Sequence, residues 1–90
     1  MKGTHVIVQG RVQGVYFRDY TTRQARQYNL TGWVQNLPDG SVEALFFGDS
    51  ENINAMLLWL KTGSPQSKVT KISTKEIDVD SPPTSFETKY

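Results

Sequence analysis

The first strand-to-helix transition of the chain reads Gly10-Arg11-Val12-Gln13-Gly14-Val15-Tyr16-Phe17-Arg18. It follows an apolar run typical of a β-strand, Val6-Ile7-Val8, and it precedes a stretch with helical character, residues 19–30. Its two glycines permit a tight turn in which backbone N–H groups converge, and a helix N-terminus adds partial positive charge. An arginine at this point can hold a phosphate with two hydrogen bonds. The stretch therefore predicts a backbone cradle for an anion.

The length and composition of the chain are typical of a small globular protein. Its 90 residues leave no room for a second hydrophobic core, so we expect one domain over residues 1–90. The chain has no cysteine, which excludes disulfides, thiolate metal sites and a cysteine nucleophile. No apolar run approaches the roughly 20 residues of a membrane span, and no stretch resembles a signal peptide. We therefore expect a cytoplasmic protein with no membrane partner.

Charge is distributed unevenly along the chain. Residues 1–36 hold five basic side chains and one acidic one, whereas residues 37–90 hold five basic and eight acidic side chains. All four arginines lie between positions 11 and 26. This concentration of positive charge would attract an anion. For Arg23 and Arg26, the plainer interpretation is a solvated basic face of a helix.

Hydrophobic periodicity and turn residues divide the chain into seven elements. The sequence Leu37-Pro38-Asp39-Gly40 favours a tight turn between two strand-like runs, which predicts a hairpin. Apolar residues at spacing i, i+3, i+4, i+7, from Ile53 to Leu60, predict a helix that lies on a sheet. We expect strands over residues 4–11, 32–36, 42–47, 69–79 and 86–90, a helix over 19–30, and a second helix that begins at Asp49 or Ser50 and ends at Gly63.

Some details of these elements depend on single residues. Asn29 can close the first helix, because asparagine tolerates the left-handed backbone conformation. Ile72 and Ile77 lie five residues apart, so a regular strand would place them on opposite faces. A bulge within residues 73–76 would bring them to one face. In the last strand, the side chains expected on one face are Phe86, Thr88 and Tyr90.

The predicted order of elements is βαββαβ followed by a short C-terminal strand. Two helices on one antiparallel sheet make a two-layer α/β sandwich of the ferredoxin-like type, in the α+β class. Because this fold carries many unrelated functions, the function must be inferred from the site.

Residue types that the chain lacks, or has only once, narrow the chemistry of the site. A catalytic metal needs clustered histidine, cysteine or carboxylate ligands, and the single histidine, His5, is interpreted as an ordinary strand residue. A Ser-His-Asp triad would need the same histidine. A cysteine-based phosphatase loop would have its cysteine six residues before the arginine, where this chain has Val12. We therefore expect no metal and no cofactor, and water as the nucleophile if the loop binds a phosphoryl group.

A water nucleophile needs a group that holds it in place. A neutral amide can do so with one donor and one acceptor, and Asn36, at a strand end before a tight turn, is the candidate. Alternatively, Asn36 starts the turn by hydrogen-bonding to the backbone. No general acid is apparent, so the leaving group should be a weak base such as a carboxylate. These points favour mixed carboxylic–phosphoric anhydrides as substrates.

Two segments closely resemble the two signatures of the acylphosphatase family. The first is the stretch of residues 10–18 quoted above. The second combines Gly32-Trp33-Val34-Gln35-Asn36 with Asp39-Gly40-Ser41-Val42-Glu43. Their order and spacing and the length of the chain agree with the family. Residues at further familiar places are Ala25, Gly48, Trp59, Leu60 and Gly63.

The resemblance implies a metal-free hydrolase that splits small-molecule acyl phosphates into a carboxylate and inorganic phosphate. Inorganic phosphate or another small anion would then compete with the substrate. Carried over by position, Arg18 binds the phosphate and Asn36 orients the attacking water. The short chain is expected to be a monomer. The backbone amides that would form the cradle are those of Gly14, Val15, Tyr16, Phe17 and Arg18.

Two positions depart from the common pattern of the family. Tyr16 stands where smaller or other residues are frequent, so it could crowd the rim of the cradle. Alternatively, Tyr16 is partly buried and anchors the loop. Residues 28–30, Tyr-Asn-Leu, replace a Leu-Gly-Leu-like helix end, where asparagine substitutes for glycine at modest cost.

Two other classes of protein fit parts of the sequence. A phosphate- or carbamoyl-phosphate-binding module, with weak or no catalysis or within a larger assembly, would keep the cradle and bind without turnover. RNA-recognition modules share the βαββαβ order, but they carry a Lys/Arg-Gly-Phe-like motif on the third strand. Residues 42–47 read Val-Glu-Ala-Leu-Phe-Phe instead. We therefore expect no nucleic-acid partner.

Overall fold

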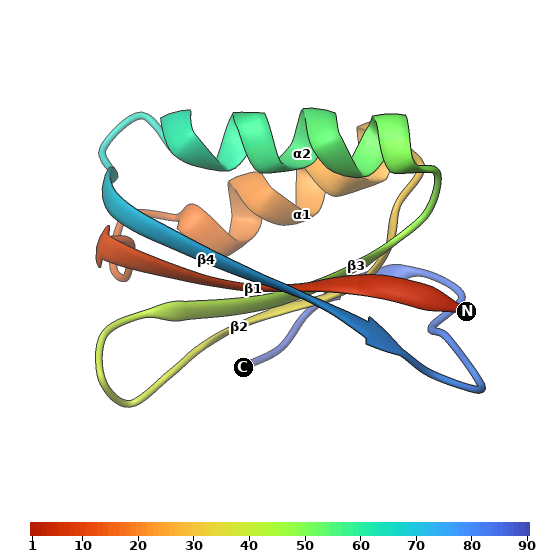
Figure 1. Cartoon of the computed structure of the whole chain (residues 1–90). Helices are drawn as coiled ribbons and strands as arrows, with labels where there is room; N and C mark the ends of the chain where they lie inside the picture. Colours follow the sequence, from red (N-terminus) through yellow and green to blue (C-terminus); the bar gives the residue numbers. More distant parts are fainter.

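The computed structural model describes residues 1–90, and its elements follow the predicted order. Both helices lie on the same face of a five-stranded sheet, as Figure 1 shows. The predicted two-layer sandwich of the ferredoxin-like type is therefore confirmed. The elements are β1 (Lys2–Arg11), α1 (Phe17–Gln27), β2 (Thr31–Asn36), β3 (Val42–Phe47), α2 (Ser50–Thr62), β4 (Lys68–Asp78) and β5 (Phe86–Thr88).

The sheet is antiparallel, as predicted, except at its short last strand, which makes the sheet mixed. Its strand order is β4-β1-β3-β2-β5, and all neighbouring strands are antiparallel except β2 and β5. The end of β4 lies at the same end of the sheet as the start of β2, as the pairings Asp78 with Lys2 and Thr31 with Phe47 show. After crossing that end, the chain enters β5 beside the start of β2 and runs in the same direction. The short last strand is therefore parallel to its neighbour.

Helix α1 begins two residues earlier and ends three residues earlier than predicted. It begins at Phe17 because Tyr16, its N-cap residue, adopts a left-handed conformation with φ of 60°. It ends at Gln27, and Asn29 has φ of 57°, which confirms the left-handed closing role predicted for it. Leu30 leaves the helix and enters the hydrophobic core.

Helix α2 matches its predicted bounds. Asp49 is the N-cap residue, although its side chain caps no backbone N–H, and Gly63 ends the helix with a positive φ of 68°. The apolar stripe along α2 faces the sheet, and its residues Ile53, Met56 and Leu60 are buried. No helix of the structure is long and apolar enough to cross a membrane.

The predicted bulge within residues 73–76 is wrong. The strand irregularity lies where Gln9 and Gly10 of β1 meet β4, and the pairing is regular at Ile72 and Ile77. The side chains of the two isoleucines lie on opposite faces of the sheet. Ile72 packs against the core between sheet and helices, whereas Ile77 pairs with Gly3, over which the ring of Phe47 lies. The sheet therefore has buried apolar side chains on both faces, and no bulge is needed.

Polar contacts on the face of the sheet opposite the helices involve His5, Glu43 and Gln35. The Nε2 atom of His5 lies 2.8 Å from Oε2 of Glu43, and Gln35 Nε2 donates to Oε1 of the same carboxylate at 2.6 Å. These hydrogen bonds, that of His5 first, hold the pKa of Glu43 below its ordinary value. His5 is a strand residue, as predicted, and its contact crosses from β1 to β3.

Candidate active site

The loop of residues 12–16, between β1 and α1, turns at two residues with positive φ. Gly14 has φ of 74° and Tyr16 has φ of 60°. A Cβ at Gly14 would meet no atom within 4 Å, so the backbone conformation, and not close packing, favours glycine there. Because Tyr16 is the N-cap residue, the loop passes directly into the first turn of α1.

The loop is fixed by buried side chains and by a hydrogen bond from the segment between α2 and β4. Val12, Val15 and Phe17 are buried, and the Phe17 ring lies 6.2 Å from the ring of Trp59 on α2, centroid to centroid. The hydroxyl of buried Ser64 donates to the carbonyl oxygen of Val15 at 2.8 Å. These contacts hold the backbone amides in place before any ligand arrives, as electrostatic preorganisation requires.

A second anchor joins the loop to the β2–β3 hairpin. The side-chain amide of Gln13 donates to the carbonyl oxygens of Leu37 and Ser41, both at 2.8 Å. Leu37 directly follows Asn36 at the end of β2. Gln13 therefore sets the position of the loop relative to Asn36.

The amides of residues 14–18 donate no hydrogen bond to any backbone acceptor. The first amide of the segment that does so is that of Tyr20, which donates to the carbonyl of Tyr16 at 3.1 Å. Unpaired N–H groups at a helix N-terminus, together with the helix dipole, form an anion-binding site. The predicted cradle residues Gly14, Val15, Tyr16, Phe17 and Arg18 therefore supply donors that the fold itself does not use.

Arg18 lies in the first turn of α1, and its guanidinium contacts the C-terminal segment. Its Nη1 donates to the carbonyl oxygen of Lys89 at 2.9 Å, and its Cζ lies 4.7 Å from the centre of the Tyr90 ring. The remaining guanidinium N–H groups have no partner in the protein. The hydrogen bond to Lys89 thus orients the guanidinium of Arg18, whose other N–H groups are available to bind an anion.

Asn36, at the end of β2, lines the same pocket as Arg18. Its Oδ1 atom is buried and accepts no hydrogen bond. A buried polar atom without a partner is costly and is usually paired in proteins, and the structure has one other such atom, Thr21 Oγ1. The pocket has a volume of about 440 Å³ and is lined by Val12, Gly14, Tyr16, Phe17, Arg18, Asp19, Asn36 and Tyr90.

The turn after β2 is stabilised by Asp39, which leaves Asn36 free of that role. The carboxylate of Asp39 accepts hydrogen bonds from the hydroxyl of Ser41 and, at 3.0 Å, from its backbone amide. These bonds, the hydroxyl first, hold the pKa of Asp39 below its ordinary value. Gly40 closes the turn by donating to the carbonyl of Leu37 at 3.2 Å. The interpretation of Asn36 as the residue that starts the turn is therefore wrong.

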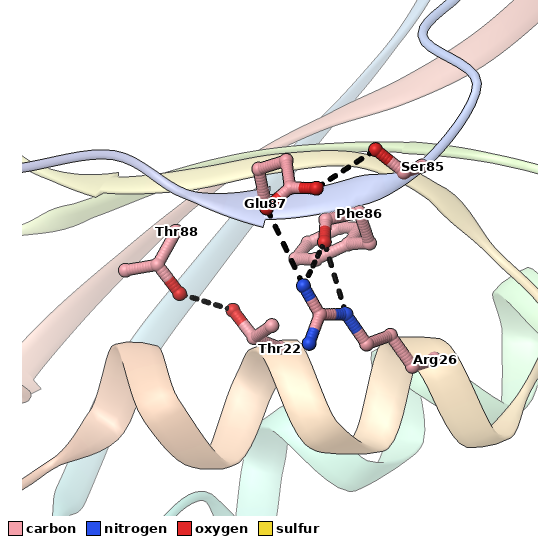
Figure 2. Close-up of polar contacts among 6 residues, drawn as sticks. All are labelled: Thr22, Arg26, Ser85, Phe86, Glu87 and Thr88. Atoms are coloured by element: carbon pink, nitrogen blue, oxygen red, sulfur yellow. Dashed lines mark hydrogen bonds and ion pairs between the residues drawn. The ribbon is translucent and has the colours of Figure 1, made fainter.

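Two further side-chain interpretations are corrected. Tyr16 is 71% exposed, so its ring lies at the rim of the pocket and does not anchor the loop. Arg26 is more than a solvated helix residue, because its Nε and Nη2 donate to the carbonyl of Phe86 at 3.1 and 2.9 Å (Figure 2). The hydroxyls of Thr22 and Thr88 also meet, at 2.6 Å. Together these contacts join α1 to β5, the strand that leads to Lys89 and Tyr90.

Sequence reasoning did not identify Gln13, Ser64 and Lys89 as supporting residues. Gln13 donates to the backbone carbonyls of Leu37 and Ser41, and Lys89 acts through its own backbone carbonyl and amide. Contacts of the backbone do not depend on residue type, so a sequence pattern does not indicate them. Ser64 follows the helix-ending Gly63, so its position suggested only a loop. A polar residue that stays buried beside a helix end, as Ser64 does, is visible only in the fold.

Comparison with known proteins gives a consistent result over the whole chain. The acylphosphatase family model matches residues 4–88. An acylphosphatase of Methylococcus capsulatus is 46% identical over 86 residues, which cover 96% of this chain and 94% of that protein. The crystal structure of acylphosphatase from Bacillus subtilis superposes with a TM-score of 0.95 at 40% identity, over 100% of both chains.

A larger protein contains a similar unit. The structure of T. kodakarensis HypF matches 99% of this chain with a TM-score of 0.89 and 38% identity, but the match covers 12% of the HypF chain. The matches of full length are the more informative, since they agree with this chain in extent as well as in fold. From the family match over residues 4–88 and the 46% identity to a curated relative, the chain belongs to the acylphosphatase family.

Proposed function

We propose that this protein hydrolyses acyl phosphates by in-line attack of a water that Asn36 orients on a phosphoryl group held by Arg18 and the amides of residues 14–18. The family to which the chain belongs supports the reaction. The observation that carries the mechanism is that the cradle segment with Arg18 and the distant Asn36, which come from two parts of the chain, border one pocket of about 440 Å³.

Substrate binding begins with the phosphoryl oxygens. The unpaired amides of residues 14–18 and the free edge of the Arg18 guanidinium offer donors fixed in advance by the anchors of the loop. Charge-assisted bonds of this kind are short and strong, and a guanidinium can bind two oxygens at once. The same groups stabilise the equatorial oxygens as the loose transition state forms.

The attacking water is held by the amide of Asn36. Asn36 lines the pocket, and its side-chain amide can hydrogen-bond to the water and so direct the water's lone pair toward phosphorus. Asn36 acts by orientation, because a neutral amide is too weak a base to take the proton. A single group that acts in this way is typically worth about 3–4 kcal/mol, or roughly 10²–10³ in rate.

The leaving group must depart without strong acid catalysis. No histidine lines the pocket, and the proposed mechanism assigns no general acid there. A carboxylate departs unprotonated, because it is a weak base. The bond between phosphorus and the acyl oxygen breaks as the bond between phosphorus and the water oxygen forms. The products are a carboxylate and inorganic phosphate, and the proton of the water passes to solvent.

A second candidate is a phosphate-binding unit that binds without turnover. The similarity to a small part of HypF shows that an equivalent unit can occur within a longer chain. The two candidates differ in one measurable property, because both predict phosphate binding but only the hydrolase consumes acetyl phosphate.

The role of Arg18 is tested by the variant Arg18→Ala. We expect KM for acetyl phosphate and the inhibition constant of inorganic phosphate to rise together, and kcat to fall, because the guanidinium contacts both the bound anion and the transition state. Arg23→Ala is a matched control, since Arg23 lies on the same helix with its guanidinium over Tyr20, outside the pocket. Unchanged phosphate inhibition in Arg18→Ala would contradict the assigned role.

A further inference from the structure

Two exposed tyrosines border the pocket in addition to the groups that bind phosphate. Few large apolar side chains of the chain are exposed, and among them Tyr16 is 71% exposed and Tyr90 is 97% exposed. Both line the pocket that contains the cradle. The cradle needs neither ring, because its donors are backbone amides and a guanidinium. The rings are therefore available for another part of the ligand.

The position of Tyr16 is unusual for a bulky residue. Its φ of 60° lies in the left-handed region, which residues of this size rarely adopt and in which glycine or asparagine is more common. The ring is not packed in the core, so burial of its surface does not compensate for the backbone conformation. Because Tyr16 lines the mouth of the pocket, its side chain can contact a bound ligand.

Tyr90 is held beside the phosphate-binding arginine. Its ring lies 4.7 Å from Cζ of Arg18, within the range of a cation–π contact. The preceding residue, Lys89, is fixed to β2 by a hydrogen bond from its amide to the carbonyl of Val34 at 2.8 Å. A ligand whose phosphoryl group is bound by Arg18 therefore lies close to the Tyr90 ring.

The size of the pocket agrees with a ligand larger than phosphate alone. A volume of about 440 Å³ lies within the range of sites that enclose whole small molecules. Since the phosphoryl group lies on the loop amides, the acyl group must extend toward the rim, where the two tyrosines stand.

We propose that Tyr16 and Tyr90 form an acyl-binding wall that favours acyl phosphates with an aromatic acyl group over those with a small aliphatic one. This inference rests on the proposed function and adds the substrate class to it. Flat aromatic groups gain from offset or edge-to-face contact with tyrosine rings, whereas an acetyl group offers little surface for such contact.

The test compares benzoyl phosphate with acetyl phosphate as substrates. The measured quantity is the ratio of their kcat/KM values, because any effect of a substitution on Arg18 or on the loop acts on both substrates and cancels in the ratio. Tyr90→Ala removes one ring, and Tyr16→Asn removes the other while keeping a residue that tolerates positive φ. Tyr90→Phe keeps the ring, and Tyr20→Ala removes an exposed tyrosine of α1 that does not line the pocket.

We expect the benzoyl-to-acetyl ratio to fall roughly three- to tenfold in Tyr90→Ala and in Tyr16→Asn, as the loss of one aromatic contact implies. Tyr90→Phe and Tyr20→Ala should keep the ratio of the parent protein. A ratio that stays constant in both ring-removing variants would overturn the wall, even if both activities fall.

A binding measurement separates this inference from the proposed function. Benzoylphosphonate and acetylphosphonate cannot be hydrolysed at phosphorus, so calorimetry gives their relative affinities without turnover. We expect tighter binding of benzoylphosphonate and a loss of this preference in Tyr90→Ala. Equal affinities in the parent protein would overturn the wall. A protein that prefers benzoylphosphonate but turns over neither substrate would contradict the hydrolase and leave the wall supported.

Discussion

The guanidinium of Arg18 donates to the carbonyl oxygen of Lys89 at 2.9 Å, and Lys89 is itself hydrogen-bonded to β2, the strand that carries Asn36. The amide of Lys89 donates in turn to the carbonyl of Val34 at 2.8 Å, two residues before Asn36 on β2. The backbone of one residue, Lys89, thus links the first turn of α1 with β2. The relative position of Arg18 and Asn36 depends on it.

Lys89→Pro should lower activity through the placement of Arg18. Proline has no amide hydrogen, so the bond to Val34 is lost and the carbonyl that orients Arg18 is no longer fixed. We expect a several-fold rise in KM and in the inhibition constant of inorganic phosphate. Lys89→Ala, which removes the contact of the ammonium with the Trp33 ring but keeps the amide, is the control. Equal kinetics in the two variants would argue against the link.

Gln13→Leu should reduce both stability and turnover. The substitution removes two hydrogen bonds, to Leu37 and Ser41, although each carbonyl keeps a backbone donor. We expect the free energy of unfolding to fall by about 1–2 kcal/mol, as measured by urea denaturation. Because the loop would move relative to Asn36, kcat should fall more than phosphate binding does. A loss of stability with unchanged kcat would show that Gln13 has a structural role alone.

The pH dependence of stability should reflect Glu43. Its pKa lies below its ordinary value of 4.5, chiefly because His5 and then Gln35 hydrogen-bond to the carboxylate. A carboxyl whose pKa is lower in the folded protein stabilises the fold above the pKa of the unfolded chain, and this contribution is lost as the pH falls through the folded value. The free energy of unfolding of the parent protein should therefore decrease more steeply below about pH 4.5 than that of Glu43→Gln. Parallel curves for the two proteins would be inconsistent with this coupling.

Much of the fold could be predicted because local patterns determine it. The stripe from Ile53 to Leu60 and the turn residues 37–40 specify a helix and a hairpin regardless of the remaining structure. The direction of β5 could not be predicted in this way, because it depends on which end of the sheet the chain leaves after β4. The face of Ile77 depended on the pairing of β4 with β1, which places it at Gly3 under the ring of Phe47, and these residues are far apart in the sequence.

The candidate site shows the same division. Its central residues, Arg18 and Asn36, were predicted from chemistry and from the family signatures, and their roles stay predictions that kinetics must test. The supporting contacts through Gln13, Ser64 and Lys89 involve backbone carbonyls and amides, which any residue possesses and which therefore leave no sequence pattern. The monomeric state and the cytoplasmic location also stay predictions.

The orientation of water by Asn36 is tested most directly by the hydrolysis of benzoyl phosphate, followed by ultraviolet absorbance in the presence of EDTA. Asn36→Ala is compared with the parent protein and with Asn54→Ala, which alters an exposed asparagine of α2 outside this pocket. We predict rapid turnover by the parent and the control, and a kcat lower by roughly 10²–10³ in Asn36→Ala with unchanged inhibition by phosphate. Near-normal turnover by Asn36→Ala, or loss of the parent's activity in EDTA, would contradict the metal-free mechanism in which Asn36 positions the water.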